Sequence, residues 1–276
     1  MRIDSHHHFW NYSPEQYGWI SRDMEILRRD FTPADLQQVI EAAGVQAVVS
    51  VQARQSVEET QWLLELASQH AFIRGVVGWL PLMEQGVRSD IERLSQFTDF
   101  KAVRHVVQDE PDDAFLLRSD FNRGVALLKE FDLVYDILIF AKHLPNTLEF
   151  VDRHPEQKFV LDHIAKPTIR SGEFDQLWAA NLKELAKRPQ VTCKFSALVT
   201  EVRDSLWSVD LLRPYWDTAL EAFGTQRLMF GSDWPVCLLR SEYARWVAAV
   251  EDLAAGLSPG EQHDLWSQTA IRTYRL

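Results

Sequence analysis

Four side chains in this sequence are of types that could together polarise a carbonyl group and activate a water molecule: His6, His8, His163 and Asp233. The first two are two residues apart in a short apolar segment, so on a β-strand both point to the same side. Two imidazoles placed in this way can hold a metal ion or bind an oxyanion. These four residues are therefore the candidate catalytic and metal-ligating set.

Asp233 is the candidate general base because of the residues around it. In the segment Phe-Gly-Ser-Asp-Trp-Pro, Gly231 permits close approach of the chain and Pro235 ends the strand, which projects the carboxylate outward. An aspartate at a strand end also commonly forms an Asx-turn or a helix cap, and a single histidine there is commonly a structural hydrogen-bonding group. The gathering of such residues at the ends of apolar strands favours the catalytic interpretation.

Two neighbours of the histidine pair receive other roles. His7 alternates with the pair and should face the surrounding helices, so we interpret it as structural. Asp4 lies deeper along the same segment and is expected to support the pair rather than to act as a base.

Further polar and aromatic residues fall at or just beyond the predicted strand ends, and we expect them to contact substrate: Trp10, Gln52, Trp79, Arg104, His105, Asp136, Lys194 and Trp234. The cations suit substrate oxygens, and the aromatic faces suit the C–H surface of a sugar or a planar ring. Two alternatives stay open. The cations could pair with Asp136 or Asp162, because buried charges need partners, and the tryptophans could simply pack in the core.

The elements that must position these residues are eight short β-rich segments: 2–8, 46–53, 72–80, 100–107, 133–139, 158–164, 191–198 and 227–233. They are almost continuously apolar, which is typical of parallel strands covered on both faces. Eight such strands alternating with helices predict a (β/α)8 TIM barrel, whose chemistry lies at the C-terminal ends of the strands. The second architecture considered is an open doubly wound sheet, but no Gly-x-Gly-x-x-Gly loop follows the first strand.

Helix-start signals mark the segments between the strands. The sequences Thr32-Pro33-Ala-Asp35, Ser56-Val-Glu-Glu59 and Ser258-Pro259-Gly-Glu261 have the pattern of capped helix N-termini, the second of them a capping box. Helices are predicted over 33–43, 119–131 and 174–187. No repeat, low-complexity tract or linker interrupts the chain, so we expect one domain over residues 1–276.

Composition narrows the classes of partner. A formal net charge of −11 disfavours binding to nucleic acid, which requires a basic face. No apolar run reaches the roughly 18 residues of a membrane span, and the N-terminus lacks a signal-peptide pattern. Two cysteines without a C-x-x-C pair indicate neither a disulfide framework nor a cysteine zinc site. We expect a cytoplasmic protein with a small-molecule partner, and a homo-oligomer stays open.

Five motifs together resemble the sugar-lactonase branch of the amidohydrolase superfamily: Ile-Asp-Ser-His-His-His-Phe-Trp, Val-Arg-His-Val-Val-Gln-Asp-Glu-Pro, Leu-Asp-His-Ile-Ala-Lys-Pro, Cys-Lys-Phe-Ser-Ala-Leu and Phe-Gly-Ser-Asp-Trp-Pro-Val-Cys. This branch includes L-fucono-lactone and L-rhamnono-lactone hydrolases and, more distantly, 2-pyrone-4,6-dicarboxylate lactonase. The resemblance implies a TIM barrel in which the residues matching His6, His8 and His163 surround the scissile carbonyl and the one matching Asp233 activates water.

The resemblance also bears on metal content. Many superfamily members hold two metals bridged by a modified lysine at the end of strand four, but here Arg104 and His105 occupy that position and no lysine is present. The expectation is one divalent metal ion or none, with zinc the first choice because it favours nitrogen ligands and leaves a position open for water. His6, His8, His163 and Asp233 are the residues that would hold it.

Three functions are compatible with these observations. The first is hydrolysis of a sugar-acid (aldono) lactone, L-fuconolactone or a similar L-sugar lactone, by water that Asp233 activates. The second is a zinc-dependent decarboxylase or hydro-lyase of the same superfamily. The third is a sugar-binding barrel without catalysis. It ranks last because burying Asp233 among histidines would lower the stability of such a protein and serve no function in it.

Overall fold

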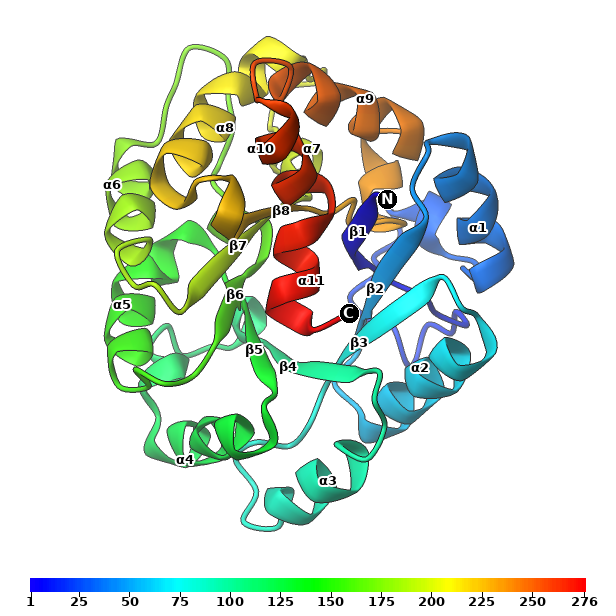
Figure 1. Cartoon of the computed structure of the whole chain (residues 1–276), viewed down its shortest axis with the longest axis vertical. Helices are drawn as coiled ribbons and strands as arrows, with labels where there is room; N and C mark the ends of the chain where they lie inside the picture. The colour runs from blue at the N-terminus through cyan, green and yellow to red at the C-terminus, as the bar shows by residue number, and fades with distance from the viewer.

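The computed structural model describes all 276 residues and contains one sheet of eight parallel strands that neighbour one another in chain order (Figure 1). The strands are β1 (Ile3–His7), β2 (Ala47–Val51), β3 (Ile73–Gly78), β4 (Phe100–Val106), β5 (Val134–Leu138), β6 (Phe159–Leu161), β7 (Val191–Phe195) and β8 (Leu228–Phe230). The predicted (β/α)8 barrel is confirmed. We call the C-terminal ends of the strands the mouth of the barrel and the N-terminal ends the bottom.

The barrel closes where the first and last strands meet. Just beyond the regular part of β8, the amide of Asp233 donates to the carbonyl of His6 at 2.8 Å, and the amide of His8 donates to the carbonyl of Trp234 at 2.7 Å. A parallel bridge pairs His7 with Trp234. The backbone that closes the barrel therefore carries candidate catalytic side chains from both ends of the chain.

Helices surround the barrel, as Figure 1 shows. They are α1 (Pro33–Ala42), α2 (Val57–Gln69), α3 (Val87–Leu94), α4 (Ser119–Leu128), α5 (Leu144–Asp152), α6 (Gln176–Leu185), α7 (Leu198–Glu201), α8 (Val209–Phe223), α9 (Tyr243–Leu253), α10 (Pro259–His263) and α11 (Thr269–Tyr274). In Figure 1 the short C-terminal helix α11 crosses the centre of the ring, and its Ala270 and Tyr274 pack against apolar residues of the barrel interior. This helix closes the bottom.

The predicted helix starts are present, with one difference in detail. Thr32 and Ser258 each form a full capping box with the acidic residue three positions later. Ser56 accepts from the amide of Glu59 at 3.0 Å, but the Glu59 carboxylate does not return to Ser56. It accepts instead from the amides of Ala53 and Arg54, both at 2.9 Å. The predicted box is therefore half formed, because this carboxylate fixes the loop after β2.

The barrel interior changes from apolar to charged along four consecutive strands. Near the bottom, strands β4 to β7 contribute Ala102, Val134, Val160 and Thr192. Two residues further along each strand, where the side chain points to the same side, stand charged residues that are at most 3% exposed: Arg104, Asp136, Asp162 and Lys194. We call these four residues the buried charge layer.

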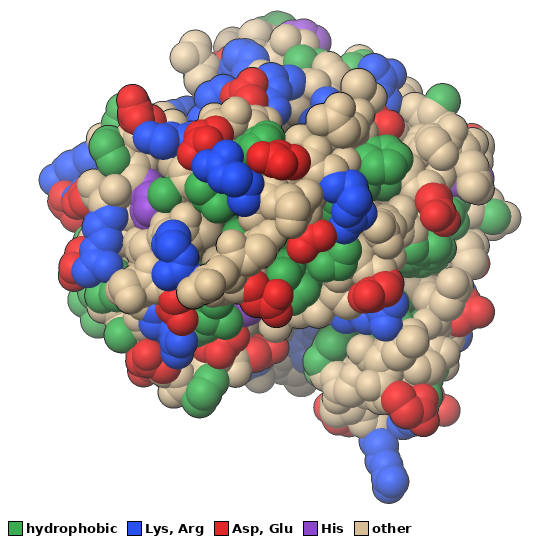
Figure 2. All heavy atoms as spheres, turned by 90° about the horizontal axis from the view of Figure 1, so that it is seen from below, with side chains coloured by type: hydrophobic (Ala, Val, Ile, Leu, Met, Phe, Trp, Pro, Cys, Tyr) green, Lys and Arg blue, Asp and Glu red, His purple; other side chains and the backbone are tan.

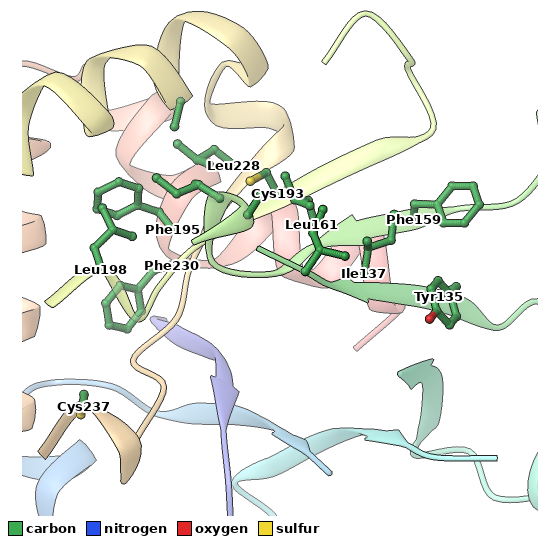
Figure 3. Close-up of a cluster of buried hydrophobic side chains, with 14 of the residues drawn as sticks. Tyr135, Ile137, Phe159, Leu161, Cys193, Phe195, Leu198, Leu228, Phe230 and Cys237 are labelled. Carbon is green, nitrogen blue, oxygen red and sulfur yellow. The ribbon is translucent and has the colours of Figure 1, made fainter. Parts of the chain in front are cut away.

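Between the barrel and its helices lies the main hydrophobic core. Figure 3 shows part of it, where Ile137, Leu161 and Phe195 extend from β5, β6 and β7, and Leu228 and Phe230 from β8. All are completely buried. Because these side chains alternate along each strand with the interior ones, both faces of each strand are covered, as the continuous apolar runs predict.

Strands six and eight are shorter than predicted, ending at Leu161 and Phe230 rather than at 164 and 233. In both places the backbone turns into the left-handed region, at His163 (φ 55°) and at Asp233 (φ 59°). Neither position with positive φ is a glycine, so the residue type does not indicate the turn and the apolar run predicts a longer strand than the chain forms.

None of the helices has the length and apolar composition that crossing a bilayer requires. On the face shown in Figure 2, basic and acidic side chains are interspersed.

Candidate active site

A cavity of about 440 Å³ opens at the mouth of the barrel. Four of the residues singled out from the sequence line it: His8, Arg104, His163 and Asp233. His6 lies directly behind them, completely buried, with its ring centroid 4.3 Å from that of His163 and 4.9 Å from that of His8. The structure therefore brings all four candidate catalytic residues together at the C-terminal ends of strands β1, β6 and β8.

The side-chain atoms of this group form a compact set. His8 Nε2 lies 3.2 Å from His6 Nε2 and 3.2 Å from Asp233 Oδ1. His6 Nε2 lies 3.6 Å from the same carboxylate oxygen, and His163 Nε2 lies 3.9 Å from it. Asp233 Oδ1 is thus the common neighbour of three imidazoles.

Hydrogen-bond partners determine which nitrogens carry protons. His8 Nδ1 must donate to the carbonyl of Val51 at 2.8 Å, which leaves the Nε2 lone pair free. His6 has a cationic donor near each ring nitrogen: the Arg104 guanidinium lies 3.3 Å from Nε2 and the Lys194 ammonium lies 3.3 Å from Nδ1. Asp162 Oδ1 lies 3.4 Å from His6 Nδ1.

Burial keeps the imidazoles of His6 and His163 neutral. The pKa of His6 lies well below its ordinary value because the ring is completely buried, and the positive charge of Lys194 lowers it further. Burial likewise holds the pKa of His163 well below its ordinary value. Neutral rings have the lone pairs that metal ligation requires.

The donor set fits a zinc ion. Ligand atoms at tetrahedral zinc, with bonds of about 2.0–2.1 Å, are separated from each other by roughly 3.3 Å. The triangle formed by His6 Nε2, His8 Nε2 and Asp233 Oδ1 has edges of 3.2, 3.2 and 3.6 Å. The three residues form one of the groups of ligand atoms close enough to share an ion. His163 Nε2 stands farther off, at 3.9 Å from the carboxylate oxygen.

The buried charge layer lies directly beneath this set. Lys194 Nζ is 2.6 Å from Asp136 Oδ2 and 3.0 Å from Asp162 Oδ1, and Arg104 Nη1 is 3.0 Å from Asp162 Oδ2. Burial alone would raise the pKa of Asp162, but the charges of Lys194 and Arg104 outweigh it and lower the pKa to about 2. Burial raises the pKa of Asp136 to about 6. Two cations and two carboxylates thus balance one another out of contact with water.

This arrangement places three of the expected substrate contacts below the cavity rather than on its wall. Asp136, Lys194 and Gln52 are completely buried. Gln52 Oε1 accepts from Arg104 Nε at 2.8 Å, so its contact is with the guanidinium. Of the cations and amides expected to meet substrate, only Arg104 lines the cavity.

The expected aromatic contacts are also placed elsewhere. Trp10 and Trp234 are at most 2% exposed and pack on either side of Phe31, with ring centroids 5.2 Å from it in both cases. Trp79 donates to His105 Nδ1 at 3.2 Å, and His105 stacks on Phe115. None of these four residues is part of the cavity wall. Packing, the alternative left open for the tryptophans, is what their surroundings show.

Asp4 and His7 lie as expected of supporting residues. Asp4 Oδ1 accepts from the amides of His6 at 3.1 Å and Ser232 at 2.8 Å, so one carboxylate holds β1 and the segment after β8 together. His7 is completely buried and pairs with the Ser50 hydroxyl at 2.8 Å, away from the cavity.

Several wall residues were missed by the sequence reasoning, chiefly Trp19, Met24 and Lys166. Trp19 and Met24 come from the long segment between β1 and α1, which has no periodicity that could place them. Lys166 is the last residue but one of the Leu-Asp-His-Ile-Ala-Lys-Pro motif, so it could have been found as a charged residue just beyond a strand end. Arg54, one of the polar residues that the sequence places at the end of the second strand, does line the cavity.

With this geometry in place, the comparisons with known proteins identify the class. The sequence matches the family model of the amidohydrolases over residues 3–276. The chain belongs to the amidohydrolase family.

Three individual proteins are similar to this chain over its whole length. The chain is 44% identical over 290 residues to an L-fucono-1,5-lactonase of Burkholderia multivorans, and the match covers 100% of this chain and 96% of that protein. An L-fucono-1,5-lactonase of Burkholderia ambifaria is 35% identical, again with 100% and 96% coverage. A solved structure of an amidohydrolase from Burkholderia multivorans with bound zinc superposes with a TM-score of 0.94 at 44% identity, covering 100% of this chain and 99% of that one.

Proposed function

We propose that this protein hydrolyses a sugar-acid lactone, L-fucono-1,5-lactone or a similar L-sugar lactone, to the free acid. The observation that carries the proposal is the likeness, over the whole chain, to an L-fucono-1,5-lactonase at 44% identity. The cavity adds a chemical reason, because Asp233 Oδ1 lies at its inner end among three imidazoles.

In the proposed reaction Asp233 accepts a proton from a water molecule in the cavity, and the water oxygen bonds to the lactone carbonyl carbon. The resulting tetrahedral intermediate carries negative charge on the former carbonyl oxygen. When it collapses, the bond from the carbonyl carbon to the ring oxygen breaks, and Asp233 returns its proton to that oxygen. The product is the open-chain hydroxy acid.

His163 has the geometry to stabilise the oxyanion. The Ser196 hydroxyl lies 2.7 Å from His163 Nδ1 and can donate to it, which leaves the proton of the neutral ring on Nε2, facing the cavity. An N–H group aimed at the developing charge lowers the barrier because it is already oriented before the reaction. Arg104, on the same wall, adds a fixed positive charge.

A divalent ion, with His6, His8 and Asp233 as the residues that would hold it, supplies positive charge that polarises the lactone carbonyl when it is bound. Zinc is the ion that this donor set fits. The part that His6 and His8 play is to present ring nitrogens in a fixed orientation.

The test is a pH-indicator assay against a panel of fucono-, rhamnono-, galactono- and arabino-lactones, with and without a chelator. We expect rapid turnover of an L-sugar lactone, and we expect Asp233→Asn to lower kcat/KM by about 10²- to 10⁴-fold because the general base is lost. The thermal unfolding midpoint of the variant serves as the control for folding. Unchanged turnover by Asp233→Asn would remove Asp233 from the mechanism, and no turnover of any lactone by the wild type would refute the proposed function.

A further inference from the structure

A left-handed turn follows strand β6. Four consecutive residues without a glycine among them, His163, Ile164, Ala165 and Lys166, have φ values of 55°, 45°, 62° and 48°. Each such residue costs roughly 1–2 kcal/mol relative to the right-handed conformation. For the β-branched Ile164 this conformation is a clear outlier. Backbone strain of this kind persists only where surrounding structure enforces it, and it gathers at functional sites.

Contacts from neighbouring elements hold the turn in place. Trp178 of α6 donates from Nε1 to the carbonyl of Ile164 at 2.7 Å, and the amide of Lys166 donates to the carbonyl of His163 at 2.8 Å. Ile164 and Ala165 are completely buried. The result is that the first and the last residues of the turn, His163 and Lys166, both reach the wall of the cavity.

Lys166 differs from the other cations of the cavity in having no partner. Arg104 pairs with Asp162 at 3.0 Å, and Arg54 Nε lies 3.9 Å from Glu59 Oε1. Lys166 Nζ forms neither a hydrogen bond nor an ion pair with the protein, and it lies 5.8 Å from the centroid of the Phe140 ring. A half-buried ammonium group without a protein acceptor is available to a ligand, because its three N–H donors are otherwise left to water.

We infer that Lys166 is a substrate-binding residue that determines specificity, donating hydrogen bonds to the hydroxyl groups of the lactone ring. The inference rests on the proposed function and deepens it. A sugar lactone presents several hydroxyl oxygens as acceptors, and an ammonium group can meet them without a fixed planar geometry. The turn brings Lys166 to the same cavity as His163. In the proposed complex, His163 therefore faces the lactone carbonyl and Lys166 contacts the hydroxyl groups of the ring.

The test compares Lys166→Met with the wild type on two lactones. Methionine keeps an unbranched stem and has no greater difficulty than lysine with a left-handed backbone, so the change removes the charge and leaves the turn unaltered. One ligand is L-fucono-1,5-lactone, and the other is δ-valerolactone, which has the ring ester but no hydroxyl groups. The second is followed as a substrate or, where turnover is slow, as a competitive inhibitor.

We expect Lys166→Met to lower kcat/KM for the hydroxylated lactone by about 10- to 100-fold, the range for a lost hydrogen bond to a charged group. With δ-valerolactone we expect less than about a 2-fold change in kcat/KM or in the inhibition constant. Lys166→Arg should recover part of the loss. The control is Lys142→Met, which removes a lysine that pairs with Asp113 at 2.6 Å outside this cavity and should leave both ligands unaffected.

Each outcome is decisive. A selective loss with the hydroxylated lactone supports the inference, and equal losses with both ligands overturn it, because they indicate a role at the ester or in folding. Thermal unfolding of Lys166→Met, expected to match the wild type, separates those two roles. If the wild type turns over no lactone, the proposed function fails and the assignment of Lys166 fails with it.

Discussion

The two ends of the barrel differ in which residues adopt the left-handed backbone conformation. At the bottom, the residues with positive φ are Gly44, Gly224 and Asp132, where helices return to strands, and Arg275, which follows α11. Glycine has no Cβ penalty there, and aspartate tolerates the conformation well. At the mouth, after β6, β7 and β8, the non-glycine residues with positive φ are those of the His163 turn together with Ala197 and Asp233.

The interior shows the same division. Near the bottom, β4, β5 and β6 contribute the small apolar residues Ala102, Val134 and Val160, and helix α11 packs beneath them. One layer nearer the mouth, charged residues that are at most 3% exposed follow on the same strands or just beyond their ends. The interior at the bottom is apolar, as stability favours. Runs of strained non-glycine backbone and buried charged side chains are concentrated at the mouth, next to the cavity.

The largest effect on stability is expected in the buried charge layer. Lys194→Met removes the cation that lies between Asp136 and Asp162 and leaves buried carboxylate charge without compensation. We expect the free energy of unfolding to fall by about 3–5 kcal/mol, measured by urea denaturation. A second substitution, Asp136→Asn in the same chain, should restore part of the loss.

The matched control is Lys183→Met, which breaks an exposed pair with Glu221 at 2.7 Å and should cost less than about 1 kcal/mol. If Lys194→Met costs no more than this control, the charge layer is not a special feature of the mouth and the contrast between the two ends fails.

An intermediate effect is expected from Glu59, the buried carboxyl group that holds the loop after β2. Burial raises its pKa from 4.5 to about 7. A carboxyl pKa that is higher in the folded protein means that folding favours the protonated form, so the stability from this group is greatest below pH 4.5 and is lost as the pH rises to about 7. The total loss should be about 3 kcal/mol.

Glu59→Gln isolates this contribution. The amide stays neutral and can still accept from the amides of Ala53 and Arg54, so the variant should lack this part of the pH dependence. The measurement is the difference in unfolding free energy between variant and wild type at about pH 4.5 and about pH 7.5, which cancels the other titrating groups. A difference that does not move in favour of the variant at the higher pH would contradict the prediction.

The smallest effect is expected at the bottom. Gly44 has φ 68°, and no atom lies within 4 Å of the position that a Cβ would take, so Gly44→Ala tests the backbone alone. We expect a loss of about 1 kcal/mol in unfolding free energy, since the left-handed cost exceeds the gain from a less flexible unfolded chain. Gly86→Ala, equally uncrowded but at φ −82°, should instead be neutral or slightly stabilising.

Most of the barrel could be predicted from the sequence because its strands are covered on both faces. Segments such as Ala47–Val51 and Val134–Leu138 are apolar at all positions but one, and eight such segments at a regular spacing indicate a closed parallel sheet. The meeting of His6 and Asp233 followed from the same reasoning, since parallel strands bring all their C-terminal ends to one side.

The parts that escaped prediction depend on contacts between distant segments. The sequence around His163 and Lys166 does not predict a left-handed turn, because the turn is held by Trp178, which belongs to the next helix. Trp19 is exposed and Trp10 is buried, and because both are tryptophans the residue type does not predict this difference. A charged residue at a strand end, such as Lys194, gives no sign of whether it meets substrate or another charge.

The closure of the barrel has a consequence for how the protein comes into existence. The hydrogen bonds that join β1 to the segment after β8 are made by His6, His8, Asp233 and Trp234, so the seam and the reaction centre are the same structure. While the chain is being synthesised, the histidines emerge first, and more than two hundred further residues follow before their carboxylate partner appears. The backbone that closes the barrel and the proposed catalytic group are therefore completed together, when the segment after β8 joins β1.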